Sequence, residues 1–185
     1  DPESFAGTLE SIVALRPERI ALYAYAHLPE RFKAQRRINE RDLPAPSVKL
    51  ALLGTAIREL TRAGYRYIGM DHFALPGDPL ARALDAGTLQ RNFQGYSTHG
   101  QCDLVGLGMS AISHVDGCFA QNARDLPGYY QALEQGRLAI ARGIAMDAED
   151  LLRAEMIQSV MCRNRGEFAA IERRFAIRFE QHFAP

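Results

Sequence analysis

The feature that most constrains the fold is an alternation of helical and strand-like segments in the first 70 residues. Residues 2–15 carry apolar side chains at helical spacing, and residues 19–25 form a short, nearly continuous apolar run of the kind found in buried strands. A second helical pattern runs from Ser47 to Gly64, and residues 65–70 form a second strand candidate. Helices that alternate with strands predict an α/β protein with a parallel sheet.

The rest of the sequence divides into a polar stretch and a helical stretch. Residues 71–117 are rich in glycine and polar side chains, with a helical segment near 78–85 and a strand candidate at 103–108. Such a stretch is typical of a ligand-facing edge. The sequence then becomes helical, and the expected helices cover residues 125–141, 147–161 and 165–183. We therefore expect a domain boundary near residue 142.

The charge balance excludes a general attraction to polyanions. The chain has 22 basic and 22 acidic side chains, so no net field would draw it to nucleic acid or to an anionic membrane. No apolar run reaches the roughly 18 residues that a membrane-spanning helix needs. The opening residues also lack the pattern of a signal peptide. We expect a cytoplasmic protein.

Three cysteines, Cys102, Cys118 and Cys162, are too widely spaced for a disulfide framework or for the close pairs of a zinc ribbon. Reduced thiols are the simplest interpretation. An alternative is a metal site made by His99, Cys102, His114 and Cys118, whose spacing is loosely like that of a zinc site. Under this alternative the chain is an unrelated α/β protein with a metal-binding loop.

The predicted strand and helix units are too few for a closed barrel. Two or three such units cannot close a barrel alone, and a sheet with two unprotected edges invites aggregation. We therefore expect that the protein has further sequence on at least one side of this chain.

Several segments combine unusual residues in ways that hydrophobic periodicity does not explain. They are Tyr25–Pro29, Gly69–Ala74, Arg91–Tyr96, the glycine-rich Asp103–Ser113, Tyr129–Tyr130 and Arg142–Ile144. In their residues, order and spacing, these segments resemble the oxygen-independent coproporphyrinogen III oxidase family of radical-SAM enzymes. The resemblance spans nearly the whole chain.

The resemblance implies a fold and a domain division. Residues 1–142 would be the later βα units of an incomplete TIM-like, radical-SAM barrel, and residues 143–185 would be the start of an α-helical C-terminal domain. The family holds a [4Fe–4S] cluster with cysteines in a CxxxCxxC motif, which the cysteines of this chain do not form. We expect the motif to lie before Asp1, so that this chain alone would bind no cluster and have no activity.

The resemblance also implies a reaction. The family converts two propionate side chains of coproporphyrinogen III to vinyl groups without oxygen, which gives protoporphyrinogen IX and two molecules of carbon dioxide. The cluster and S-adenosylmethionine (SAM) would supply the radical that removes hydrogen from the propionate. An electron acceptor of unknown identity would take the electron that the substrate loses. The expected partners are this substrate and acceptor, with no nucleic acid or membrane, and the expected state is a monomer.

Four residues match functional positions of the family, which binds two SAM molecules. Ile112 matches a contact to the SAM molecule on the cluster, and Ala26 matches a contact to the second molecule. Gln94 and Phe93 match positions near the reacting centre, where an amide can hold a carboxylate or a cofactor and a ring can form an apolar wall. The alternative is that Ala26, Ile112 and Phe93 are core residues and that Gln94 is a solvated loop residue.

Three other polar residues are weaker candidates. Asp71 and His72 follow a strand candidate, where α/β barrels place functional groups, so they are either a substrate contact or a buried pair that satisfies itself. Arg91 either meets a substrate carboxylate or lies on the surface.

A second function lies within the same resemblance. Haem chaperones related to the oxidases share the glycine-rich strand and the helical tail, but they bind haem without decarboxylating coproporphyrinogen. The Asn92–Tyr96 segment favours the oxidase, because the chaperones differ there.

Overall fold

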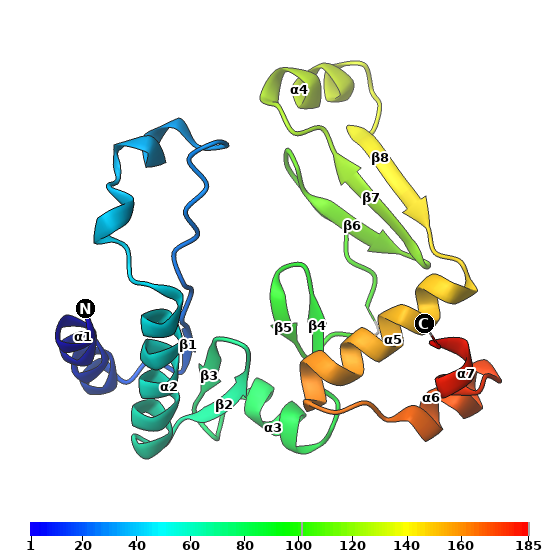
Figure 1. Ribbon diagram of the computed structural model, residues 1–185. Coiled ribbons are helices and arrows are strands. Elements are labelled where there is room, and N and C mark those ends of the chain that lie inside the picture. Colours follow the sequence, from blue (N-terminus) through cyan, green and yellow to red (C-terminus); the bar gives the residue numbers. More distant parts are fainter. Residues whose placement is uncertain (101, 185) are drawn as a thin grey trace. The chain divides into compact units, whose positions relative to one another are not determined.

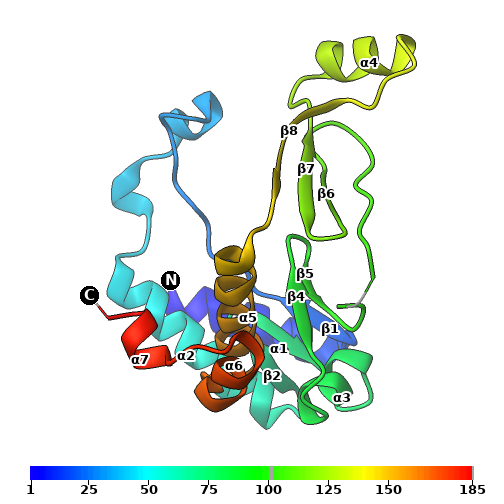
Figure 2. The same cartoon turned by 90° about the vertical axis from the view of Figure 1, so that its right-hand side faces the viewer.

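The computed structural model of the chain describes residues 1–100 and 102–184. It divides into two compact units, Asp1–Thr88 and Leu89–Pro185, and each is described by itself. Figures 1 and 2 show their helices and strands. The domain boundary predicted near residue 142 would divide a longer protein, and it stays a prediction. In this structure residue 142 lies inside a strand, β8 (Ile140–Ala145).

The two long helices of the first unit start where local sequence favours a helix start. α1 (Pro2–Leu15) is capped by Asp1, whose side chain accepts a hydrogen bond from the Ser4 amide. α2 (Pro46–Arg62) begins at its proline, a residue favoured at the first helical position, one residue before the expected Ser47. Both predicted helices are thus confirmed: α1 has the predicted bounds, and α2 starts one residue earlier than predicted.

The sheet of the first unit is antiparallel, so the predicted parallel sheet is wrong. β1 (Arg19–Ala21) and β2 (Arg66–Gly69) both pair with β3 (His72–Ala74), which lies between them. Only Met70 and Asp71 connect β2 to β3, and Met70 adopts a φ of 52°. A two-residue connection joins antiparallel strands, whereas a parallel pair needs a long crossover. β3 lies at the start of the stretch predicted to be polar, so this hairpin was not predicted.

β1 is also shorter than the strand predicted over residues 19–25. Beyond it the chain leaves the sheet and passes through two short 3₁₀ helices, η1 (Lys33–Arg37) and η2 (Glu40–Asp42), before it enters α2. Figure 1 shows this segment extending away from α2 and the sheet. Its two prolines, Pro29 and Pro44, do not favour a continued strand.

The third helix, α3 (Pro79–Asp85), confirms the helical segment predicted near residues 78–85. Its N-cap Asp78 is buried and accepts a hydrogen bond from the Leu80 amide at 2.7 Å. The same carboxylate pairs with Arg19 Nε of β1 at 2.6 Å. A buried carboxylate needs such partners, and this one ties α3 to the sheet.

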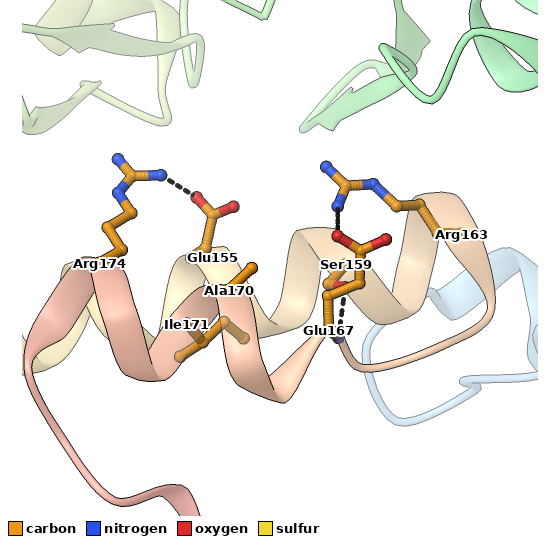
Figure 3. Close-up of a pocket in the computed structure, with 7 residues that line it drawn as sticks. All are labelled: Glu155, Ser159, Arg163, Glu167, Ala170, Ile171 and Arg174. Atoms are coloured by element: carbon orange, nitrogen blue, oxygen red, sulfur yellow. Dashed lines mark hydrogen bonds and ion pairs between the residues drawn. The ribbon is translucent and has the colours of Figure 1, made fainter.

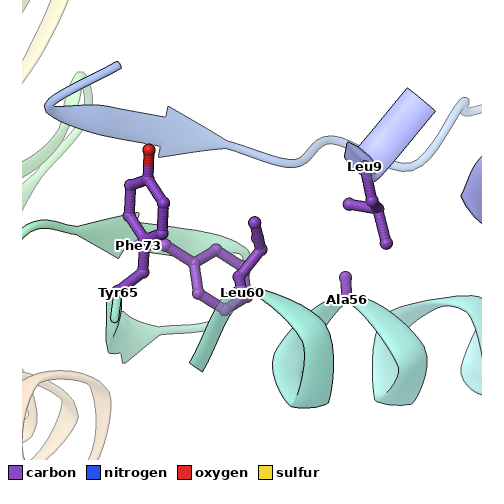
Figure 4. Close-up of a cluster of buried hydrophobic side chains, with 5 residues drawn as sticks. All are labelled: Leu9, Ala56, Leu60, Tyr65 and Phe73. Carbon is purple, nitrogen blue, oxygen red and sulfur yellow. The ribbon is translucent and has the colours of Figure 1, made fainter. Parts of the chain in front are cut away.

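The core of the first unit lies between its two long helices and its sheet. The buried side chains are Leu9, Ala56, Leu60, Tyr65 and Phe73. Figure 4 shows Leu9 facing Ala56, with Leu60, Tyr65 and Phe73 gathered beside the sheet. The Tyr65 hydroxyl donates to the Pro17 carbonyl at 2.8 Å, so its polar atom is satisfied.

The second unit contains a hairpin and a three-stranded sheet. The hairpin consists of β4 (Gln90–Asn92) and β5 (Gly95–Ser97). β6 (Ile112–Val115), β7 (Cys118–Asn122) and β8 form an antiparallel sheet in chain order. Figure 2 shows α4 (Leu126–Glu134) at the end of this sheet, where it connects β7 to β8.

The strand predicted at residues 103–108 is absent from the described structure. Leu104 alone forms an isolated bridge, to His114, and the next residues lie outside any strand. Gly108 adopts a φ of 97°, which takes the chain out of the extended conformation that pairing requires.

The helix predicted over residues 125–141 is too long. α4 ends at Glu134, and Gly136 adopts a φ of 67°. Glycine in this left-handed conformation commonly terminates a helix. The residues from Ile140 onward enter β8 instead.

The final segment is helical, as predicted. α5 (Ala148–Arg163) confirms the first of the two expected helices. The single helix predicted over residues 165–183 is instead a pair, α6 (Phe168–Phe175) and α7 (Phe179–His182). Ala176 adopts a left-handed conformation with φ 52° and ends α6 there.

Candidate functional site

The two predicted catalytic residues occupy the turn of the β4–β5 hairpin. Phe93 and Gln94 connect the paired residues Asn92 and Gly95. The side chain of Asn92 accepts a hydrogen bond from the Gln94 amide at 2.9 Å, which fixes the turn locally. The Gln94 side chain is exposed. The turn therefore presents an amide that can meet a ligand.

The base of this hairpin is fixed to α5. The Arg91 backbone amide donates to Gln158 Oε1 at 3.1 Å, and Gln158 Nε2 donates in turn to the Arg91 carbonyl. Across the hairpin, the Tyr96 hydroxyl donates to the Met161 carbonyl at 2.9 Å. The Arg91 guanidinium lies over the Tyr96 ring, 5.5 Å from its centroid. α5 therefore determines where the turn lies in this unit.

Aromatic contacts join the turn to the three-stranded sheet. Phe93 meets Phe119 of β7 edge to face, with centroids 5.4 Å apart and planes at 81°. Phe119 in turn stacks on His114 of β6 at 4.2 Å. Phe93 is 60% exposed, so the prediction that it is merely a core residue is wrong. The structure thus places the predicted catalytic turn beside the sheet in which Ile112 lies.

Ile112 is the first residue of β6 and is half-buried. It pairs with Gln121 of β7. Gly106 approaches its backbone so closely that a Cβ built on this glycine would lie 2.7 Å from the Ile112 carbonyl oxygen. Only glycine fits such an approach. The predicted SAM contact therefore lies where two backbone segments meet without intervening side chains.

Ala26 lies in the other compact unit, in the extended segment after β1. It is exposed, so the interpretation of Ala26 as a core residue is wrong. Gln35 of η1 donates from Nε2 to the Ala26 carbonyl at 3.2 Å and accepts from the Leu28 amide at 2.5 Å. The small, open side chain of Ala26 on a held backbone suits a contact to a bulky ligand.

The weaker candidates of the polar stretch pair with neighbours. Asp71 Oδ1 lies 2.6 Å from His72 Nδ1, and the Tyr23 ring meets the His72 ring edge on at 6.0 Å. Burial raises the pKa of Tyr67, and the charge of Asp71 adds to this increase. Asp71 and His72 form a pair, as one of the two alternatives predicted.

A small pocket between α5 and α6 is structural in character (Figure 3). Ion pairs span it between Arg163 and Glu167 at 2.8 Å and between Arg174 and Glu155 at 2.6 Å. The buried Ser159 hydroxyl accepts from the Glu167 amide at 3.3 Å. These polar groups pair with one another. The pocket is therefore part of the packing between α5 and α6.

Comparison with known proteins decides the family. No protein-family model matches the chain. The oxygen-independent coproporphyrinogen III oxidase of Pseudomonas aeruginosa is 52% identical over 183 residues, which are 99% of this chain and 40% of that protein. The enzyme of the same name from Escherichia coli is 48% identical over the same shares. A solved structure of the E. coli coproporphyrinogen III oxidase (HemN), described as a radical SAM enzyme, matches with a TM-score of 0.93 and 47% identity, over 99% of this chain and 42% of that chain.

The chain belongs to the oxygen-independent coproporphyrinogen III oxidase family.

The comparison confirms the family that the sequence segments indicated. The chain spans 40% of the length of these two curated relatives. Its mixed helix and strand structure is the one found in the matching part of the solved E. coli oxidase.

The described thiols do not fit an iron–sulfur cluster of this oxidase family. Cys102 and Cys118 are exposed and Cys162 is buried. Across residues 1–100 and 102–184, no three His, Cys, Asp or Glu side chains lie close enough to hold a metal ion. His114 of the alternative zinc site stacks on Phe119 instead. The zinc interpretation therefore has no support in the geometry.

Two residues that support the β4–β5 turn, Gln158 and Phe119, were not predicted from the sequence. Gln158 holds the backbone of Arg91, and Phe119 contacts Phe93. For Gln158 the sequence offers only a weak signal, a glutamine on the otherwise apolar face of a helix. No sequence signal distinguishes Phe119 from any other aromatic residue of a strand. Arg91 itself is half-buried, with its guanidinium over the Tyr96 ring.

In the part of this chain that the structure describes, no helix is both long and apolar enough to cross a bilayer.

Proposed function

We propose that this chain works as part of a longer radical-SAM enzyme that decarboxylates coproporphyrinogen III without oxygen. The enzyme would convert two propionate side chains to vinyl groups and give protoporphyrinogen IX. The observation that carries this proposal is the match of nearly the whole chain, in sequence and in structure, to enzymes of this one name. The same proposal places a monomeric protein in the cytoplasm.

The proposed architecture follows from the same similarity. Residues 1–142 would contribute later βα units to an incomplete TIM-like barrel, and residues 143–185 would begin an α-helical domain. The succession of α5, α6 and α7 after β8 supports the second part. The β1–β3–β2 sheet of the first unit is antiparallel, so a barrel strand of this unit would need further, parallel neighbours.

Two SAM molecules are proposed, one beside Ile112 and one beside Ala26. Ile112 lies at the strand end and is half-buried, so its aliphatic side chain and the backbone beside it can pack against an adenine ring. Ala26 offers an exposed methyl group on a backbone that Gln35 holds. When bound with the cluster, SAM supplies the one-electron chemistry that starts the reaction. The cluster ligands would come from outside this chain.

Gln94 and Phe93 are proposed to act at the reacting centre. The exposed Gln94 amide can both donate and accept, so it can hold a carboxylate without adding charge. Phe93 shields the turn on the side where it meets Phe119 and helps to exclude water from a reactive intermediate.

The decisive experiment is an anaerobic assay of the complete protein with a reconstituted cluster. Coproporphyrinogen III, SAM and an electron donor are supplied, and the products are separated by chromatography after oxidation to porphyrins. We expect vinyl products that require SAM. The matched control is the same protein with Gln94→Ala at equal cluster content. Tight binding of haem without any vinyl product would contradict the proposal and indicate the chaperone.

A further inference from the structure

The glycine-rich segment beside Ile112 is held by side chains and not by a strand ladder. Gly106 donates its amide hydrogen to Ser113 Oγ at 3.0 Å. Gly108 donates its amide hydrogen to the Tyr129 hydroxyl at 3.2 Å. Neither glycine belongs to a strand, so these side chains replace the partners that a neighbouring strand would supply.

The carbonyl groups of the same two glycines share one donor. Asn122 Nδ2 donates to the Gly106 carbonyl at 3.3 Å and to the Gly108 carbonyl at 2.9 Å. An amide nitrogen carries two hydrogens, so a single asparagine can serve both acceptors. Asn122 thus bridges two backbone positions on either side of Leu107.

The position of Asn122 explains how its side chain reaches this segment. It is the last residue of β7, and the register with β8 shifts between Gln121 and Asn122. Such an irregularity re-aims the side chains that follow it. The Asn122 backbone amide also donates to the Ala111 carbonyl at 3.0 Å, immediately before Ile112.

The inner side of the segment is closely packed. A Cβ on Gly106 would lie 2.7 Å from the Ile112 carbonyl oxygen, whereas the side chain of Leu107 points outward and is 86% exposed. The inner side of the segment is therefore backbone packed against backbone, and its outer side offers an apolar residue to a ligand.

We propose that Asn122 is a positioning residue for SAM binding beside Ile112. By holding the carbonyls of Gly106 and Gly108 in place, it keeps the backbone groups next to Ile112 in the arrangement that the cofactor meets. This inference rests on the proposed function, because it takes Ile112 as the SAM contact. Asn122 itself contacts only protein.

The test measures SAM affinity in the complete protein with its cluster intact. SAM is titrated into the reduced protein and followed through the cluster spectrum, which reports the molecule bound there and not the one beside Ala26. Asn122→Ala removes two hydrogen bonds, and we expect SAM affinity to fall on the order of tenfold. Asn122→Asp keeps the shape but faces two carbonyl oxygens with a carboxylate, so we expect a larger loss.

The KM for coproporphyrinogen III and the cluster content should stay unchanged in both variants. A merely structural role would lower cluster content and stability and would raise both KM values together. The matched control is Gln135→Ala, which removes an exposed amide at the end of α4 in the same unit. It should bind SAM as the wild type does.

A second variant keeps the inference testable if the Asn122 variants fold poorly. Tyr129→Phe removes only the hydroxyl that accepts from Gly108, and we expect a smaller fall in SAM affinity with normal folding. Wild-type SAM affinity in Asn122→Ala, or in Tyr129→Phe where the Asn122 variants fail to fold, would overturn the inference. Absence of SAM binding in the wild-type protein would instead contradict the proposed function.

Discussion

The ring of Phe93 meets the ring of Phe119 edge to face, with their centroids 5.4 Å apart. Phe93 lies in the β4–β5 turn, and Phe119 is the second residue of β7. This one contact joins the turn that carries Gln94 to the sheet that carries Ile112. The predicted catalytic and cofactor-binding positions of the second unit are therefore parts of one local structure.

Replacing Phe119 should disturb the turn without unfolding the protein. Phe119→Leu keeps an apolar side chain but loses the aromatic contact, which is worth about 0.5–1.5 kcal/mol. We expect the rate of vinyl formation by the complete protein to fall on the order of tenfold if the turn loses its position. The control is Phe168→Leu in α6, a partly exposed ring distant from the turn in sequence. Equal rates in both variants would show that Phe119 does not position Phe93.

Gln94 can be tested with two substitutions in the complete protein. Gln94→Ala removes the amide at the proposed reacting centre, where a misplacement of about 1 Å can cost on the order of a hundredfold in rate. Gln94→Glu should fail as well, because its carboxylate repels the substrate carboxylates and cannot donate a hydrogen bond. Vinyl product is measured at equal cluster content. If both variants react at the wild-type rate, Gln94 is only a solvated loop residue.

The 185-residue chain by itself should assemble no iron–sulfur cluster. Its three thiols are spread over exposed and buried positions and cannot replace a close set of thiolates. Anaerobic reconstitution with iron and sulfide, followed by absorption spectroscopy, is the measurement. A stable [4Fe–4S] spectrum from the isolated chain would disprove this expectation.

Cys162 should resist alkylation in the folded chain, whereas Cys102 and Cys118 should react. Burial raises the pKa of the Cys162 thiol above its ordinary value of 9.0, so its thiolate is scarce even at alkaline pH. Because the folded state holds this proton more tightly than the unfolded state, stability should decline as pH rises above 9.0. Mass spectrometry after iodoacetamide treatment follows each cysteine separately. Equal labelling of all three would contradict the burial of Cys162.

The first unit should depend strongly on Leu60. This side chain is fully buried among Leu9, Ala56, Tyr65 and Phe73, so Leu60→Ala should cost about 2–5 kcal/mol of unfolding free energy. The control is Leu50→Ala on the same helix, where the side chain is 71% exposed and the cost should be small. Chemical denaturation of both variants measures the difference. Similar midpoints would show that the core does not close around Leu60.

Several features of this protein were determined by its sequence alone. The periodic apolar residues of α1, α2 and α5 predicted those helices, because an amphipathic helix must bury one face whatever its neighbours are. The unusual residues of Asn92–Tyr96 and of the glycine-rich segment indicated the family, which the comparisons confirmed. These features are local, so they can be read without knowing what lies opposite them.

Only the tertiary structure decided how the strands pair and which residues support the site. Pairing direction depended on the two-residue connection Met70–Asp71, and an apolar run has no direction of its own. The contact of Phe119 with Phe93 and the bond of Gln158 to Arg91 join residues that are distant in sequence. The glycine-rich segment looks like a strand but pairs with side chains, because a backbone group takes whichever partner folding brings to it.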